Sequence, residues 1–227
     1  MHEEHNSEHK PEHHEHDRPA GGMPEIPKVD FKNVNAGSLK GGLGDVIEIL
    51  KLNKAVIEKV ANRDSEGISI AIVYIAAGAL ISALGGPIIG YSGFRTPIGG
   101  ALIGAALAVL VTSVIIYVTN FAAEKLFQGH GKFPQYFRVM GYASLVNVLG
   151  FIMPILPYSL ISLFGLILLA WGVAVNYVVL TTVHKLNSTN AVLTMIIQVL
   201  AYFVLGAVVA SLGLAALGAA GAGYPLR

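Results

Sequence analysis

The sequence predicts an all-α, polytopic membrane protein with five transmembrane helices, and three observations carry this prediction. The chain divides into a polar, charged part over residues 1–67 and a nearly continuous apolar part over residues 68–223. No Asp or Glu follows Glu124, and charged residues make up 13% of the chain, about half of the roughly 25% usual in soluble domains. The mean hydropathy of +0.63 is also far above that of a soluble domain.

The first 42 residues are predicted to form a disordered cytoplasmic tail, because they are rich in proline and glycine and poor in large apolar side chains. Most of the histidines of the chain lie in this tail, at His2, His5, His9, His13, His14 and His16. Such a tract is typical of a weak metal site for zinc, nickel or copper. The irregular spacing and Pro11 favour the other interpretation, a solvated low-complexity tail.

Residues 43–67 are predicted to form an interfacial segment with one amphipathic helix over residues 43–62. Its apolar stripe consists of Leu43, Val46, Ile47, Leu50 and Ile57, widened by Ile49, Val56 and Val60. Charged side chains occupy the opposite face, at Asp45, Glu48, Lys51 and Lys59. A helix of this kind directly before a first span is expected to lie on the membrane surface. The alternative is that it packs on a partner or on the ends of the bundle.

The membrane domain, residues 68–216, divides into stretches of about 20 residues, the length that a 30 Å hydrocarbon core requires. We expect spans at 68–91, 97–121, 139–156, 158–183 and 191–212, with a short tail at 217–227. Pro154 and Pro157 break the long apolar run between the third and fourth spans. The third span is short enough to be kinked or to cross only half of the membrane.

The basic residues predict the orientation of the chain. With five spans, the head, the connector 124–138 and the loop 184–190 share one side, and that side carries thirteen of the fifteen Lys and Arg. Only Arg95 and Arg227 fall on the other side. Basic residues accumulate in the cytoplasm, so the N-terminus is expected inside and the C-terminus outside. A cell membrane is the default location, because no sorting signal is readable.

Few polar side chains lie at membrane depth, namely Asn120, Ser144, Ser162 and the three that form the candidate intramembrane site: Asn147, Asn176 and Gln198. They are expected to hydrogen-bond between helices, or else to line the pathway of a small-molecule channel or permease. No carboxylate lies deep in any span, which disfavours a proton- or sodium-coupled transporter. His130 and His184, near the cytoplasmic interface, are expected to face solvent.

Small residues recur every four positions in the first two spans, at Gly86 and Gly90 and at Gly100, Gly104 and Ala108. This spacing lets helices approach closely, and it predicts packing within one bundle or, alternatively, pairing with a second copy of the chain.

Motifs for catalysis are absent from the sequence. There is no Gly-x-Ser-x-Gly elbow, no His-Glu-x-x-His zinc helix and no phosphate-binding loop. The chain has no cysteine and no basic stripe with interleaved aromatic residues. We therefore expect no enzyme activity, no cofactor and no nucleic-acid partner.

The layout resembles the Yip family, the Ypt/Rab-interacting membrane proteins, in its prokaryote-like form. The segments that carry the resemblance are IEILKLNKAVIEKVANRD before the first span, GYASLVNVLGFIMPILP in the third, and Trp171 with HKLNSTNA between the last two. The resemblance implies a helical membrane protein without catalytic activity. Eukaryotic relatives are associated with vesicle trafficking and prenylated small GTPases, but their Asp-Leu-Tyr-Gly-Pro motif is missing here.

Together these features predict a non-enzymatic protein that organises the bilayer or recruits a cytoplasmic protein partner. The surfaces expected to act are the helix 43–62 and the connector 124–138. The expected partners are the lipid bilayer, a cytoplasmic protein and a second copy of the chain. The channel or permease remains the alternative.

Overall fold

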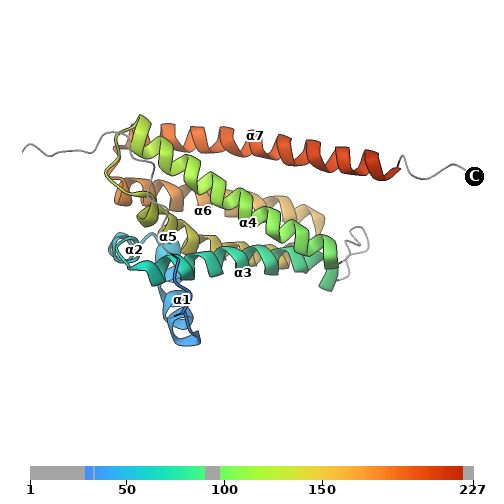
Figure 1. Ribbon diagram of the computed structural model, residues 1–227, viewed down its shortest axis with the longest axis horizontal. Helices are drawn as coiled ribbons and strands as arrows, with labels where there is room; N and C mark the ends of the chain where they lie inside the picture. Colours follow the sequence, from blue (N-terminus) through green and yellow to red (C-terminus); the bar gives the residue numbers. More distant parts are fainter. Residues whose placement is uncertain (1–28, 33, 90–97, 222–227) are drawn as a thin grey trace, which may run out of the picture.

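Helices make up nearly all of the computed structural model, which describes residues 29–32, 34–89 and 98–221 (Figure 1). Within these residues no strand occurs. The helices in chain order are α1 (Ala36–Leu50), α2 (Lys54–Ala61), α3 (Ser65–Ile89), α4 (Ile98–Phe121), the π-helical turn η1 (Ala122–Leu126), α5 (Phe133–Ala143), the 3₁₀ segment η2 (Ser144–Ile155), α6 (Tyr158–Val183) and α7 (Ser188–Gly221).

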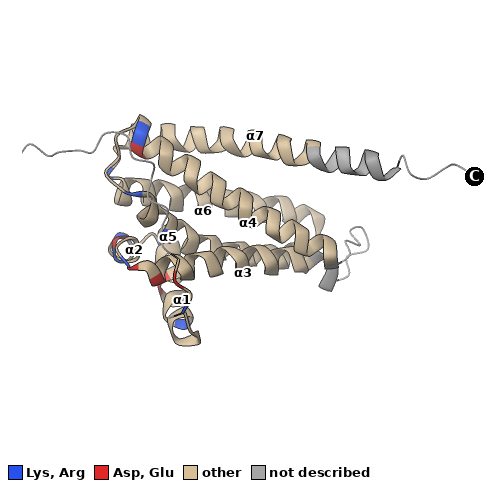
Figure 2. Ribbon diagram, viewed as in Figure 1, with Lys and Arg blue, Asp and Glu red and all other residues tan. Residues whose placement is uncertain are grey.

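Five helical stretches of the described chain are long and apolar enough to cross a membrane. They cover Ser65–Gly85, Gly99–Leu126, Phe133–Ile155, Tyr158–Val183 and Ser188–Ser211. The long helices run along one common direction, and the charged residues of the described chain gather at one end of them (Figure 2). The predicted all-α, five-span fold is therefore confirmed.

The charged end of the bundle brings together three segments that are far apart in the sequence. Lys185, in the loop after α6, forms an ion pair of 2.5 Å with Glu58 of α2. Gln135 Nε2, in the first turn of α5, donates to Asn62 Oδ1 at 3.0 Å. The head, the connector and the last loop thus lie on one side, as the sequence predicted.

The third span runs from Phe133 to Ile155, and its second half is wound as a 3₁₀ helix. α5 begins at Phe133, several residues before the expected start, with Pro134 in its first turn where a proline needs no N–H partner. From Ser144 to Ile155 the chain continues as η2, with Pro154 near its end. A 3₁₀ helix rises about 2.0 Å per residue instead of 1.5 Å. The span is therefore longer than the expected 139–156, because it begins earlier and because its 3₁₀ part rises more per residue.

Small residues hold α3 close to α5 and η2. A Cβ added to Gly141 would lie 2.5 Å from Ala71 Cβ, and one added to Gly78 would lie 2.8 Å from the Ser144 carbonyl oxygen. Such separations leave no room for a side chain, so the backbones are in direct contact.

The small-residue stripe on α4 behaves differently. Gly100, Gly104 and Ala108 are exposed, and a Cβ on Gly104 would meet nothing within 4 Å. The expected packing of this stripe within the bundle is therefore wrong, because α4 turns it outward. Pairing with a second copy stays a prediction, and Gly86 and Gly90 form a pair that falls partly outside the described residues.

The predicted single helix over 43–62 is also wrong. The structure has two helices, and α1 begins at Ala36, inside the range 1–42 that was expected to be disordered. The break falls at Leu52, whose φ of 62° lies in the left-handed region. Asn53 then precedes α2 and donates through its side chain to Glu48 Oε2 at 3.0 Å. This turn folds α2 back over α1.

Replacing Gly141 by Ala should destabilise the bundle, because the new methyl group overlaps Ala71 and forces α5 away from α3. We expect a loss of about 1–3 kcal/mol in the free energy of unfolding, typical of overpacking. Thermal melting of the protein in detergent measures it. Gly172→Ala is the matched control, since a Cβ there meets nothing within 4 Å. Equal melting temperatures for both variants would contradict the close α3–α5 contact.

Candidate functional site

α1 runs crosswise to the five spans and projects from the side of the bundle beneath α3 (Figure 1). A capping box starts the helix: Asn35 Oδ1 accepts from the Ser38 N–H, and Ser38 Oγ accepts from the Asn35 N–H, both at 3.0 Å. These two contacts satisfy N–H groups that a helix start otherwise leaves unpaired. The helix therefore begins sharply, at a defined place beside α3.

Two hydroxyl groups of α3 fasten α1 and the residues before it to the first span. Ser69 Oγ accepts from the Asp30 N–H at 3.1 Å and donates to the Asp30 carbonyl at 2.7 Å. Tyr74 Oη donates to the Leu39 carbonyl at 2.5 Å. Gly42 is needed where α1 passes this tyrosine, because a Cβ there would overlap the hydroxyl group. α1 is thus fixed alongside the first turns of α3.

A cluster of charges ties α1 to α2 and to the third span. Asp45 is 7% exposed, and its carboxylate receives Lys59 Nζ at 3.0 Å and a guanidinium nitrogen of Arg63. Arg63 Nη1 also donates to Tyr142 Oη at 2.7 Å. Charge-assisted hydrogen bonds of this kind are about twice as strong as neutral ones. Arg63 therefore links three elements, and we call Asp45, Lys59 and Arg63 the Asp45 clamp.

The face of α1 that points away from the bundle is apolar in the middle and basic at its ends. Leu43 and Ile47 are 44% and 55% exposed. Lys40 and Lys51 are exposed on the same face, one before and one after them. Lys51 also donates to Glu48 at 2.8 Å, and this contact lowers the pKa of the Glu48 carboxyl group. Both acidic side chains of α1 are thus paired with cations. Lys40 and Lys51 lie at the two ends of the exposed apolar face, and Lys51 lies there with its Glu48 contact.

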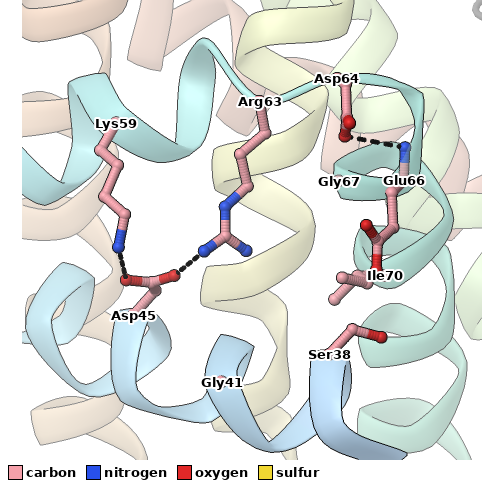
Figure 3. Close-up of a pocket in the computed structure, with 9 residues that line it drawn as sticks. All are labelled: Ser38, Gly41, Asp45, Lys59, Arg63, Asp64, Glu66, Gly67 and Ile70. Atoms are coloured by element: carbon pink, nitrogen blue, oxygen red, sulfur yellow. Dashed lines mark hydrogen bonds and ion pairs between the residues drawn. The ribbon is translucent and has the colours of Figure 1, made fainter. Parts of the chain in front are cut away.

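A cavity of about 570 Å³ opens between α1, α2 and the start of α3. Its lining consists of Ser38, Gly41, Asp45, Lys59, Arg63, Asp64, Glu66, Gly67 and Ile70 (Figure 3). The Asp45 clamp forms one wall, and Asp64 and Glu66 lie on the α3 side (Figure 3). Asp64 Oδ1 accepts from the Glu66 N–H at 3.2 Å. In the described part of the chain the Glu66 carboxylate has no hydrogen bond or ion pair of its own.

The sequence pattern could not single out the Asp45 clamp. Asp45 was placed on a polar helix face, which is usually solvated, but the turn at Leu52 brings that face against α2. Arg63 and Tyr142 are 79 residues apart, and only the packing of α3 on α5 joins them.

Of the two histidines expected to face solvent, His130 is exposed but His184 is fully buried, so that expectation is wrong for His184. The loop Gly129–Gly131 closes over its ring: a Cβ on Gly129 would lie 2.9 Å from His184 Cβ, and the His130 N–H donates to the His184 carbonyl at 3.0 Å. Among the described residues neither ring nitrogen finds a hydrogen-bond partner. Burial lowers the pKa of His184 to about 4, although Glu124 acts in the opposite direction.

The structure brings together two of the three predicted intramembrane polar residues. Tyr136 Oη donates to Asn176 Oδ1 at 2.8 Å, and Asn176 Nδ2 donates to Gln198 Oε1. These two hydrogen bonds join α5, α6 and α7 inside the membrane domain. Asn147 lies apart, exposed on η2 beside Gly78. Tyr136 is the member that sequence reasoning missed.

The histidine-rich tail, with His2, His5, His9, His13, His14 and His16, lies outside the described residues. Within the described ranges no group of three His, Asp or Glu side chains is placed to hold a metal ion.

A five-span helical bundle with a crosswise helix fastened at its charged end defines a multi-pass α-helical membrane protein. A family model, the Yip1 domain, matches residues 48–217, which is most of the chain, and the chain belongs to this family. The resemblance found in the sequence is thereby confirmed. No curated protein and no solved structure gives a significant match. The match begins within α1, so Asp45 and the exposed Leu43 and Ile47 precede it.

Removing the carboxylate of the Asp45 clamp should loosen the head. In Asp45→Ala the half-buried Arg63 loses its anionic partner, and we expect a loss of about 1–3 kcal/mol in the free energy of unfolding. Glu58→Ala is the control, because its ion pair with Lys185 is exposed and such pairs contribute at most about 1 kcal/mol. Thermal melting in detergent compares them. An Asp45 variant as stable as the Glu58 variant would show that the clamp does not hold α1.

The burial of His184 predicts a pH dependence of stability. The fold keeps the imidazole neutral down to about pH 4, whereas the unfolded chain takes up a proton near 6.5. The contribution of His184 to stability is therefore fully present above pH 6.5 and is lost, on the order of a few kcal/mol, as the pH drops toward 4. The melting temperature of His184→Phe should fall less over this range than that of the wild type. His130→Gln, at an exposed position, should follow the wild type; parallel curves for His184→Phe would refute the assignment.

Proposed function

We propose that this Yip1-domain protein organises the membrane by holding α1 in the interface of one leaflet. The observation that carries the proposal is the crosswise α1 with its outward Leu43 and Ile47 (Figure 1).

The anchors of α1 support a position at the boundary between headgroups and acyl chains. They lie at Ser69 and Tyr74, which are about 6 and 13 Å along α3 from its first residue, Ser65. The apolar part of α3 begins near Ile68. Interfacial helices lie about 5–10 Å deep, with their apolar face toward the acyl chains. At this depth Leu43 and Ile47 contact lipid, and Lys40 and Lys51 extend toward the phosphates.

The charged end of the bundle is proposed to face the cytoplasm, in the cell membrane. Thirteen of fifteen basic residues lie on the side of the head, the connector and the loop after α6. The N-terminus is then inside and the C-terminus outside. The exposed charges of α2 and the connector on this side are the surface proposed for a cytoplasmic protein partner.

A helix held in one leaflet adds volume to that leaflet alone. The added volume favours curvature toward the leaflet that contains α1, which is a physical route to shaping or sorting membranes. The Asp45 clamp matters for this role, because a wedge must be held against the lateral pressure of the lipids.

The depth of α1 is testable because the chain has no cysteine. Single nitroxide labels at Leu43→Cys and Ile47→Cys in reconstituted vesicles should be accessible to oxygen and protected from a water-soluble nickel complex. A label at Lys54→Cys, exposed at the start of α2, is the aqueous control. Labels on α1 that behave like the one at residue 54 would overturn the interfacial placement.

The consequence for shape is measured on the same vesicles. Wild-type protein should partition into narrow membrane tubes pulled from giant vesicles in preference to flat membrane. The double variant Leu43→Ser and Ile47→Ser keeps the clamp and removes the apolar wedge, so its preference for tubes should be lost. Equal sorting of both proteins would exclude the wedge mechanism.

A further inference from the structure

The cavity between α1, α2 and α3 has walls of opposite charge, and this property restricts what it can bind. We propose that it holds a phosphate ester bearing a primary ammonium group, the headgroup chemistry of phosphatidylethanolamine. The inference rests on the proposed placement of α1 in the interface, because that placement puts the cavity among lipid headgroups.

The cationic wall has hydrogen-bond donors left for a phosphate. Arg63 carries five donors, of which the contacts to Asp45 and Tyr142 use one each. Lys59 carries three donors and gives one to Asp45, with its side chain 61% exposed. Because Asp45 neutralises only one of these two cations, the wall keeps a net positive charge. Arginine and lysine at such a place are suited to phosphate oxygens.

The opposite wall is anionic. Glu66 and Asp64 lie on the α3 side of the cavity, and the Glu66 carboxylate is unpaired among the described residues (Figure 3). An anion alone would be repelled by this wall, and a cation alone by Arg63 and Lys59. A ligand with both charges satisfies both walls.

The lining also favours a primary ammonium over a choline group. A primary ammonium donates N–H hydrogen bonds, which the Glu66 and Asp64 carboxylates accept. A quaternary ammonium has no N–H and is recognised by aromatic faces. None of the nine lining residues is aromatic. The volume of about 570 Å³ is within the 300–1,000 Å³ typical of small-molecule sites.

Native mass spectrometry of the full chain in detergent tests the proposal. Phosphatidylethanolamine, phosphatidylcholine and phosphatidylglycerol with identical acyl chains are titrated separately. We expect the ethanolamine lipid to bind about tenfold more tightly than the other two, because only its ammonium group donates charged hydrogen bonds to the Glu66 and Asp64 carboxylates. Glu66→Gln keeps the size of the side chain and should abolish this preference. Glu58→Gln, an exposed glutamate outside the cavity lining, should retain it.

Each other result has a defined meaning. Equal binding of the three lipids, or an unchanged preference in Glu66→Gln, would overturn the proposal, as would a preference for phosphatidylglycerol, which indicates a plain anion site. Competition by free phosphoethanolamine at equal potency would support the headgroup chemistry but assign a soluble ligand. Should the labels on α1 prove lipid-exposed while no headgroup preference is found, this inference fails and the proposed function stands. If the labels on α1 proved to be in water, both this inference and the proposed function would lose their support.

Discussion

The position of the whole head depends on one side chain, Arg63. It sits between α2 and α3 and joins Asp45 of α1 to Tyr142 of the third span. Without this link α1 would lose its charged connection to the third span, and it would keep the Lys59–Asp45 ion pair, the Tyr74 contact and the core packing of its apolar face. Removing a partner of a partly buried guanidinium leaves its charge without compensation. This destabilises the fold by more free energy than the intact pair contributes. The head and the membrane domain are therefore one unit.

The clamp in turn depends on how closely the first and third spans approach. Gly141 and Ala71 let the two backbones touch, which sets Tyr74 and Tyr142 in edge-to-face contact with ring centroids 5.1 Å apart. Both tyrosines then face the head, one toward the Leu39 carbonyl and the other toward Arg63. Small residues deep in the bundle thus decide where α1 lies at its edge.

The sequence was sufficient for the class of fold, because the length and apolarity of membrane spans are local properties. It was also sufficient to predict which segments share the charged end, since this follows from the number of spans. It failed at Leu52, where a single left-handed residue divides an apparently continuous helix. It failed at His184 as well, because the loop that buries this ring lies more than fifty residues earlier. The first failure is a local backbone turn and the second is long-range packing, and hydrophobic periodicity reports neither.

The same limit explains why the candidate site was not visible in the sequence. Lys59, Arg63, Asp64 and Glu66 read as an ordinary charged stretch before a first span, with two cations and two anions and therefore no net charge. Folding sorts these charges, because Asp45 draws the two cations to one wall and leaves Glu66 on the other. An unsorted stretch would bind anionic lipids in proportion to its net charge. A sorted one discriminates by the arrangement of charge within a single headgroup, so lipid selectivity at equal net charge distinguishes the folded cavity from a merely charged surface.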